Sequence, residues 1–410
     1  MARNRARDGF LDAGVSLEMR IAFVIPYFAE AWEYGGPPRS AYELALGLAR
    51  RGHIVKVLTT DTGGRVRLSP RQRVDISTAG HENLRIRHYR NISNRLAFRN
   101  RLFIAPGLSV NIRKDLAGYD VVHIHELRSM TSVSAYRAAL DLRLPYVVSP
   151  HGGLRRLGKG SLKTVFDLLW GRSMLGRARA LLAVSKLEVD QASGFGVNKD
   201  RIRILPNPVR PESYRDLPDR GTFREKWQIK TPKLVLFLGR LNQIKGADLL
   251  VRAFAGLGSE AHLVIAGPDD GEEAALRKQV AAERYGRVTF VGFLDHAAKL
   301  AALVDSDVCV VPSRNEIFGM VALESLMCET PVVMSSACGL ATELDGRPGV
   351  SVFAAGDVPD LAQKIGTALG RTRDSVSDTA RMVEAEGSLD ATLDKAESVY
   401  GEFVSGPRQI

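Results

Sequence analysis

Short apolar runs alternate with helix-like segments along almost the whole chain, and this alternation limits the possible folds more than any other feature. The strand-like runs of the first half are 20–26, 54–59, 84–89, 120–124, 145–149, 179–184 and 202–205. Its helix-like segments lie near 38–51, 129–141, 161–175 and 185–193. Strands that alternate with helices predict parallel sheets with helices on both faces.

A proline-rich stretch then interrupts the pattern. Residues 206–211 contain three prolines and are predicted to be an interdomain linker. A second series follows, with strands at 233–238, 261–266, 287–291, 307–311, 331–334 and 349–353. Its helices lie near 245–257, 271–284, 295–304, 319–328 and 357–369. We therefore expect an α/β fold of two facing Rossmann-like domains, with a ligand cleft at the carboxyl ends of the strands.

Four segments follow from this pattern. Residues 1–18 are polar and irregular, and we expect a disordered leader that ends near Met19. Residues 19–205 are predicted to form the first domain, and residues 206–386 the second. The helical stretch within 387–410 has no strand to return to, and we expect it to pack back on the first domain.

The strand, loop and helix within residues 308–327 give the strongest prediction of a ligand site. The first amides of a helix lack intrahelical partners and attract anions, and Gly319 lets a ligand approach the backbone closely. Glu316 lies in the loop, and Glu324 lies about two turns into the helix. Phosphate-binding amides between two carboxylates suit a nucleotide diphosphate that carries a sugar.

Two cations are predicted at the same edge of the second sheet. Arg240 follows Gly239 at the end of an apolar strand, and Lys245 lies five residues further on, where the next helix begins. Arg binds phosphate oxygens bidentately, and Lys acts as a compact point charge. The pair would therefore stabilise a diphosphate leaving group in the transition state.

The order and spacing of these motifs resemble the retaining glycosyltransferases of the GT-B fold, family four. The matching segments of the second half are Gly239-Arg240, Lys245-Gly246, Ile265-Ala266-Gly267, Phe290-Val291-Gly292, Pro312-Ser313 and the Glu316/Glu324 pair. Those of the first half are Gly35-Gly36, Val121-Val122-His123-Ile124-His125, Ser149-Pro150-His151-Gly152-Gly153, Val184-Ser185-Lys186 and Pro206-Asn207-Pro208. The resemblance covers residues 19–370 and implies that the second domain holds a sugar nucleotide.

The resemblance also implies roles for individual residues. The catalytic residues would be His151, Arg240, Lys245 and Glu316. The donor-binding residues would be Gly35, Gly36, Gly239, Arg240, Lys245, Glu316, Ile317, Phe318, Gly319, Met320, Val321 and Glu324. Among these, Glu324 would bind the ribose and Glu316 the transferred sugar, while His151 would lie beside the anomeric carbon. The donor would be UDP- or GDP-linked, and no other cofactor is expected.

The family transfers sugars with retention of configuration, and we expect a front-face reaction in which the departing phosphate accepts the proton of the acceptor hydroxyl. This course needs neither a carboxylate nucleophile nor a metal ion. Asp305-Ser306-Asp307 has the form of a metal-binding D-x-D motif but precedes its strand, at the edge away from the cleft. His123 and His125 share a strand face, yet no third zinc ligand accompanies them. No metal site is predicted.

Positive charge is concentrated in the first half of the chain. Residues 1–200 contain 32 Lys and Arg against 17 Asp and Glu, a net charge of +15 within a total of +11. Residues 85–114 contain eight basic residues, no acidic residue and several apolar side chains. This combination favours an anionic membrane surface, where each cation contributes about 1 kcal/mol. The predicted acceptor-side or membrane-facing residues are Arg39, Arg95, Arg99, Arg101 and His125.

Two other interpretations of this basic segment stay open. Nucleic acid attracts the same charge, although no recognition-helix, zinc-knuckle or RNP pattern accompanies it. A solvated basic face with no partner is the other alternative. We expect a membrane partner and no nucleic acid.

The sequence therefore predicts a bacterial hexosyltransferase that acts on a saccharide or lipid-linked saccharide in exopolysaccharide or lipopolysaccharide synthesis. No apolar run reaches the roughly 20 residues of a membrane span, and three cysteines without paired spacing indicate a reducing compartment. We expect a cytoplasmic protein on the inner face of the plasma membrane. One alternative is a sugar-nucleotide isomerase or hydrolase of similar fold. The other is a non-catalytic scaffold or basic nucleic-acid-binding protein.

Overall fold

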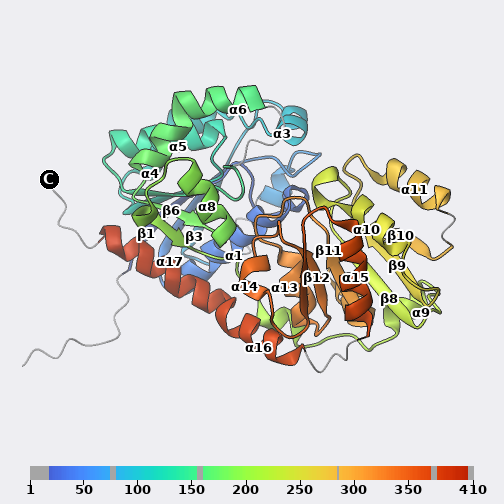
Figure 1. Ribbon diagram of the computed structural model, residues 1–410. Helices are drawn as coiled ribbons and strands as arrows, with labels where there is room; N and C mark the ends of the chain where they lie inside the picture. Colours follow the sequence, from blue (N-terminus) through green and yellow to red (C-terminus); the bar gives the residue numbers. More distant parts are fainter. Residues whose placement is uncertain (1–17, 74–79, 155–159, 284–285, 371–375, 405–410) are drawn as a thin grey trace, which may run out of the picture.

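Two parallel sheets form the centre of the computed structural model, which describes residues 18–73, 80–154, 160–283, 286–370 and 376–404. Helices cover both faces of each sheet (Figure 1). This arrangement confirms the predicted α/β class. The expected leader lies outside the described residues, apart from residue 18.

The first sheet has seven parallel strands in the order β3-β2-β1-β4-β5-β6-β7. They are β1 (Arg20–Val24), β2 (Ile54–Thr60), β3 (Leu84–Tyr89), β4 (Val121–His125), β5 (Tyr146–Ser149), β6 (Ala180–Ala183) and β7 (Ile202–Ile204). The strand order reverses between β1 and β4. Ligands of doubly wound sheets bind at the carboxyl end of such a reversal.

The second sheet has six parallel strands in the order β10-β9-β8-β11-β12-β13. They are β8 (Lys233–Leu238), β9 (Ala261–Ala266), β10 (Val288–Gly292), β11 (Val308–Val311), β12 (Val332–Ser335) and β13 (Val350–Phe353). The order reverses between β8 and β11. The Arg240 loop follows β8 and the Glu316 loop follows β11, so both leave the sheet at this reversal.

Most predicted helices are present. The longer ones are α1 (Gly36–Arg50), α5 (Met130–Asp141), α8 (Lys186–Gly194), α10 (Ala247–Phe254), α11 (Glu273–Ala282), α12 (His296–Asp305), α13 (Met320–Met327), α15 (Val358–Leu369) and α17 (Leu389–Val404). Five further helices were not predicted from the sequence: α3 (Asn94–Asn100), α4 (Pro106–Leu116), α9 (Thr222–Lys226), α14 (Ala341–Leu344) and α16 (Ser377–Glu386). Among the described residues, no helix is both long and apolar enough to cross a membrane.

One predicted helix, 161–175, is broken in the structure. It consists of α6 (Gly160–Phe166), a π-helical turn (Asp167–Gly171) and α7 (Arg172–Arg177). The Asp167 carboxylate is fully buried and accepts hydrogen bonds from Arg128, Nε to Oδ1 at 2.9 Å and Nη2 to Oδ2 at 2.8 Å. The irregular turn thus coincides with a buried ion pair, which apolar periodicity does not reveal.

The helix α17 crosses back to the first domain and packs on α1 (Figure 1). Leu393 of α17 packs closely on Gly47 of α1. A methyl group added to Gly47 would lie 2.8 Å from the Leu393 side chain. The Tyr400 hydroxyl lies 2.8 Å from Nδ1 of His123 in β4. Arg51 pairs with three carboxylates of α17, those of Asp390, Asp394 and Glu397, at 2.6–3.0 Å.

Leu393→Ala should therefore destabilise the first domain. Leu393 is 2 % exposed within the apolar layer that covers this face of the sheet, and large-to-small changes at such sites cost about 2–5 kcal/mol. The measurement is urea-induced unfolding followed by circular dichroism. Lys395→Ala, an exposed change on the same helix, serves as the control. Equal midpoints for the two variants would show that α17 contributes no packing energy.

Candidate functional site

The candidate donor-side residues lie in loops at the carboxyl edge of the second sheet. Gly246, which follows Lys245, adopts φ 71°, and a Cβ there would lie 2.2 Å from the Pro312 carbonyl oxygen. The Arg314 amide donates to the Ile244 carbonyl at 2.8 Å. The loops after β8 and β11 are therefore in direct backbone contact.

This contact brings two predicted site residues together. The Lys245 ammonium pairs with the Glu316 carboxylate, and both side chains are mostly buried. A lysine whose stem is buried and whose charged end is held by a carboxylate has a fixed position, which a long flexible side chain otherwise lacks. Glu316 lies in the loop that leads into α13, and Lys245 ends the 3-10 turn that precedes α10.

The two other charged residues predicted for this site have separate partners. Arg240 Nη1 lies 2.9 Å from Asp270 Oδ2, which also accepts from Asn242 Nδ2 at 2.8 Å. Glu324 is 8 % exposed, and its Oε1 accepts from Lys299 Nζ at 2.7 Å. The structure thus joins Lys245 to Glu316 and pairs Arg240 and Glu324 with residues that the sequence interpretation did not include.

The segment 336–340 holds the Glu316 loop in place. The Glu316 amide donates to the Ala337 carbonyl at 3.0 Å, and its carbonyl accepts from the Gly339 amide at 2.7 Å. A Cβ on Gly339 would lie 1.9 Å from the Ile317 carbonyl oxygen, so only glycine permits this approach. Gly319 then adopts φ 109° and caps α13, whose first-turn amides follow Glu316 closely in sequence.

Ile317 joins the two domains. Its carbonyl accepts a hydrogen bond from the Ser185 hydroxyl of the first domain at 2.6 Å. Its side chain lies 3.4 Å from the Cβ position of Gly152, which follows His151. The Glu316 loop and the His151 loop are therefore neighbours, although they come from different sheets.

His151 lies at the carboxyl end of β5 and interacts with a second histidine. Its Nε2 is 3.0 Å from His125 Nδ1, and its backbone is left-handed at φ 49°. Burial lowers the pKa of His151 to about 4, and it lowers the pKa of His125 as well. His151 is therefore neutral at pH 7, so one of its ring nitrogens donates a hydrogen bond and the other accepts one.

Glu188 fixes the loop that carries His151. Its carboxylate accepts from the Gly152 amide at 2.6 Å and from the Val184 amide at 2.9 Å. Burial raises the pKa of Glu188 to about 7, and the two backbone hydrogen bonds act in the opposite direction. Ser185 caps the same helix, α8, by accepting from the Glu188 amide.

A second carboxylate, half-buried, lies beside the first domain's strand reversal. Glu126 directly follows β4 at φ 66° and accepts a hydrogen bond from the Tyr27 hydroxyl. Burial raises the pKa of both groups. Arg101, predicted for the acceptor side, lies with its Cζ 4.5 Å from the centre of the neighbouring Tyr34 ring. The sequence interpretation missed Glu126, although its place directly after His125 at a strand end was a usable signal.

The remaining predicted residues lie around this region. Gly35 caps α1 at φ 99°, and Gly36 is the first residue of that helix. Arg39, in the first turn of α1, is exposed and lies with its Cζ 5.8 Å from the Trp32 ring centre. Arg95 and Arg99 are exposed on α3, and within the described residues no hydrogen bond or ion pair joins them to the other site residues.

Asp305 and Asp307 have structural partners at the amino edge of the second sheet. The Asp305 carboxylate accepts from the backbone amides of Gly221 and Arg224, and Asp307 pairs with Arg224 at 2.8 Å. Over the described ranges, no group of three or more His, Cys, Asp or Glu side chains is arranged to hold a metal ion.

The chain is similar to known glycosyltransferases. Residues 34–213 match the model of Glycosyltransferase Family 4, and residues 232–371 match that of Glycosyl transferases group 1. A D-inositol 3-phosphate glycosyltransferase of Xylanimonas cellulosilytica is 31% identical over 340 residues, which are 78% of this chain and 79% of that protein. An uncharacterized glycosyltransferase of Methanocaldococcus jannaschii is 28% identical over 356 residues, 78% of this chain and 82% of that protein.

Solved structures share the fold. HepE of Anabaena, crystallised with UDP and glucose, superposes with a TM-score of 0.76 at 18% identity, covering 94% of this chain and 100% of that one. WaaG, a glycosyltransferase involved in lipopolysaccharide biosynthesis, superposes with a TM-score of 0.66 at 19% identity, with the same coverage. These likenesses confirm the predicted architecture of two Rossmann-like domains.

Glu188 should make stability depend on pH. The folded protein keeps a proton on this carboxyl up to about pH 7, whereas an unfolded glutamate loses it near 4.5. Stability from this group is therefore full below pH 4.5 and is lost as the pH rises to 7, by about 3 kcal/mol. Glu188→Gln should flatten the change in thermal midpoint between pH 5 and pH 7.5.

The exposed change Glu260→Gln should leave that pH dependence as in the unmodified protein. A Glu188→Gln variant with an unchanged pH dependence would contradict the proton uptake assigned to this carboxyl.

Proposed function

We propose a donor, a reaction course and an acceptor for this chain, which belongs to the family 4 glycosyltransferases of group 1. As in that family, the donor is a nucleotide sugar and the reaction is a retaining sugar transfer. We propose UDP-linked hexose as the donor, because the related structure of HepE holds UDP and glucose. The observation that carries the proposal is the Lys245–Glu316 pair at the start of α13, next to the His151 loop.

In this proposal Lys245 and Arg240 hold the diphosphate, and their charges stabilise it as it leaves. A guanidinium has five N–H donors, so Arg240 can contact a phosphate without losing Asp270. The Glu316 carboxylate accepts hydrogen bonds from hydroxyls of the transferred sugar, and the Glu324 carboxylate accepts them from the ribose hydroxyls. The departing phosphate accepts the proton of the acceptor hydroxyl, and neutral His151 offers a hydrogen bond beside the reacting carbon.

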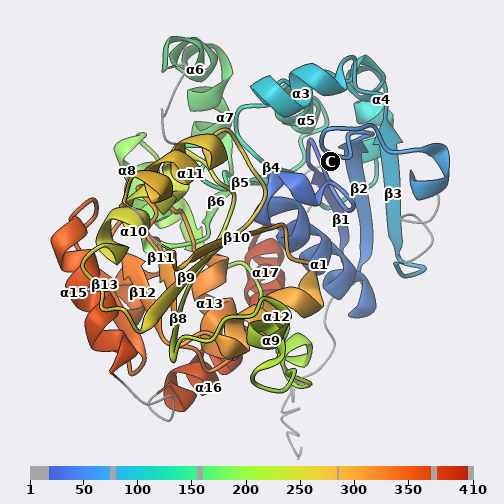
Figure 2. The same ribbon diagram turned by 90° about the vertical axis from the view of Figure 1, so that its right-hand side faces the viewer.

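The acceptor we propose is a lipid-linked saccharide at the inner face of the plasma membrane, in exopolysaccharide or lipopolysaccharide assembly. The basic segment 85–114 supports this acceptor, because α3 exposes Arg95 and Arg99 beside the apolar Leu96. Figures 1 and 2 place α6 at the same end of the first domain. The α6 region exposes four large apolar side chains, those of Leu162, Val165, Leu168 and Leu169.

A second acceptor has its own support. The relative from Xylanimonas cellulosilytica is named for D-inositol 3-phosphate, a small phosphorylated polyol. The two acceptors are separated by incubating the enzyme with UDP-glucose and either D-inositol 3-phosphate or a lipid-linked saccharide in micelles. UDP release that requires one of them, with a glycosylated product, identifies the class. UDP-glucose consumed equally without any acceptor would instead support a hydrolase.

Lys245→Ala and Arg240→Ala should each lower kcat, because each removes a charge that stabilises the leaving diphosphate. The expected increase in activation free energy is about 2.7–4 kcal/mol for each variant. The measurement is the rate of UDP release at saturating UDP-glucose. Lys278→Ala removes an exposed cation from α11 and should retain the normal rate. If kcat is normal in both site variants, the leaving-group role is wrong.

Membrane association should depend on α3. Arg95→Gln combined with Arg99→Gln should weaken binding to anionic vesicles by about 2 kcal/mol at low salt, since each cation near the surface contributes about 1 kcal/mol. Co-sedimentation at two ionic strengths measures this. The control, Lys230→Gln with Arg347→Gln, removes the same charge from exposed sites of the second domain. If the unmodified protein binds neutral vesicles as strongly as anionic ones, a membrane role for the basic segment is contradicted.

A further inference from the structure

A hollow of about 620 Å³ lies at the amino edge of the first sheet, where no site has been described so far. Its wall includes Tyr146, the first residue of β5, and Arg179, which directly precedes β6. The His151 loop leaves β5 at the opposite, carboxyl end. The hollow is therefore separate from the candidate transferase site.

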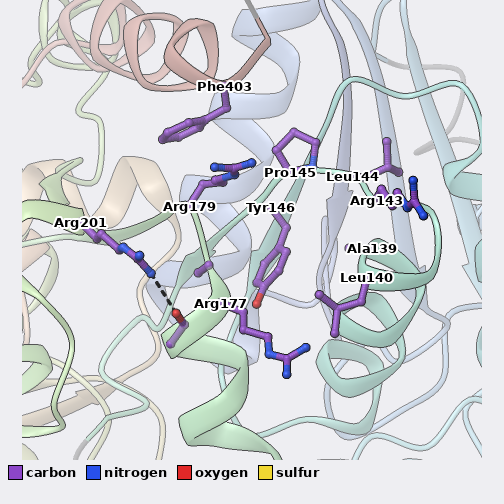
Figure 3. A pocket seen from close by; sticks show the side chains of 12 residues that line it. Ala139, Leu140, Arg143, Leu144, Pro145, Tyr146, Arg177, Arg179, Arg201 and Phe403 are labelled. Atoms are coloured by element: carbon purple, nitrogen blue, oxygen red, sulfur yellow. Dashed lines mark hydrogen bonds between the residues drawn. The ribbon is translucent and has the colours of Figure 1, made fainter. Parts of the chain in front are cut away.

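Four arginines line this hollow, and none of its twelve lining residues is acidic. Figure 3 shows Arg179 and Arg201 on one side of Tyr146, Arg143 on the other side and Arg177 below it. Arg143 follows α5, Arg177 is the last residue of α7 and Arg179 follows it, and Arg201 ends the 3-10 turn before β7. Distant parts of the sequence thus bring guanidinium groups to one concave surface.

The charges around the hollow do not cancel. Arg201 Nη1 donates to the Gly176 carbonyl at 2.9 Å, which is a helix-end contact. The carboxyl ends of α5 and α7 contribute about −0.5 charge each. Two nearby carboxylates are occupied elsewhere: Asp141 accepts from Arg113 Nε at 2.7 Å, and Glu402 pairs with Arg203 at 3.1 Å. A third acidic residue, Asp200, directly precedes Arg201 and is exposed. Asp200 contributes at most one more negative charge, so roughly two positive charges remain.

The floor of the hollow is apolar. Leu140, Leu144 and Pro145 line it on one side, and Phe403 of α17 lies above Arg179 (Figure 3). A guanidinium group can bind a phosphate through two parallel N–H···O hydrogen bonds, and it also stacks on planar groups. A volume of this size accommodates an organic phosphate rather than a single ion.

We propose that this hollow is a second anion site, which binds a ligand carrying two or more phosphoryl charges. The ligand is either a free polyphosphorylated compound or the headgroup of an anionic membrane lipid. The proposal does not rest on the transferase reaction, because none of the four arginines belongs to that site.

The test uses Arg143→Gln combined with Arg177→Gln, two changes at exposed positions. The control is Lys230→Gln with Arg347→Gln, which removes the same charge elsewhere. One arm titrates pyrophosphate calorimetrically into each protein with UDP present at saturation, so that the candidate donor site is occupied. The other arm measures co-sedimentation with vesicles of neutral lipid containing phosphatidic acid.

The proposal predicts about tenfold weaker binding of at least one probe to the hollow variant than to the control, the loss expected when a charged hydrogen bond is removed. A difference with pyrophosphate indicates a free ligand, and a difference only with vesicles indicates a lipid headgroup. If the hollow variant and the control bind both probes equally, the proposal is wrong. Matching thermal midpoints of the two variants exclude misfolding as the cause.

Discussion

The contact of Ile317 with the first domain is the interaction on which the candidate site depends. The Ile317 carbonyl accepts from the Ser185 hydroxyl at 2.6 Å, and Gly339 lies against the same carbonyl. Ser185 also caps the helix whose Glu188 holds the Gly152 amide. One short chain of hydrogen bonds therefore links the loop of Glu316 with the loop of His151, and each domain helps to position the other's residues.

The sequence predicted the two sheets because buried parallel strands are short, continuous apolar runs rich in β-branched residues, and their length separates them from helices. It did not reveal α3 as a helix, because that helix has only seven residues and buries only Ala97 fully. It also predicted one helix over 161–175, where a buried carboxylate, Asp167, coincides with a π-helical turn. The local sequence pattern does not reveal the π-helical turn, because the Asp167–Arg128 ion pair at that turn joins residues far apart in the sequence.

The candidate site was predictable where residues follow strands directly. Lys245 and Glu316 meet because β8 and β11 are adjacent, and strand adjacency follows from the fold class. Glu188 was not predictable, because its carboxylate acts on the backbone of a loop 36 residues away in sequence. The partners Asp270 and Lys299 were missed for a similar reason: each comes from a different loop or helix, and no spacing rule connects them to Arg240 or Glu324.

The central claim is that the carboxyl edge of the second sheet binds a nucleoside diphosphate. The most direct measurement is the thermal midpoint with UDP, GDP, ADP and TDP, each with and without magnesium. Binding at a hundred times the dissociation constant adds about 2.7 kcal/mol of stability. The account predicts that UDP raises the midpoint most, equally with and without magnesium, and that Lys245→Ala removes the effect. No shift with any of the four nucleotides would contradict it.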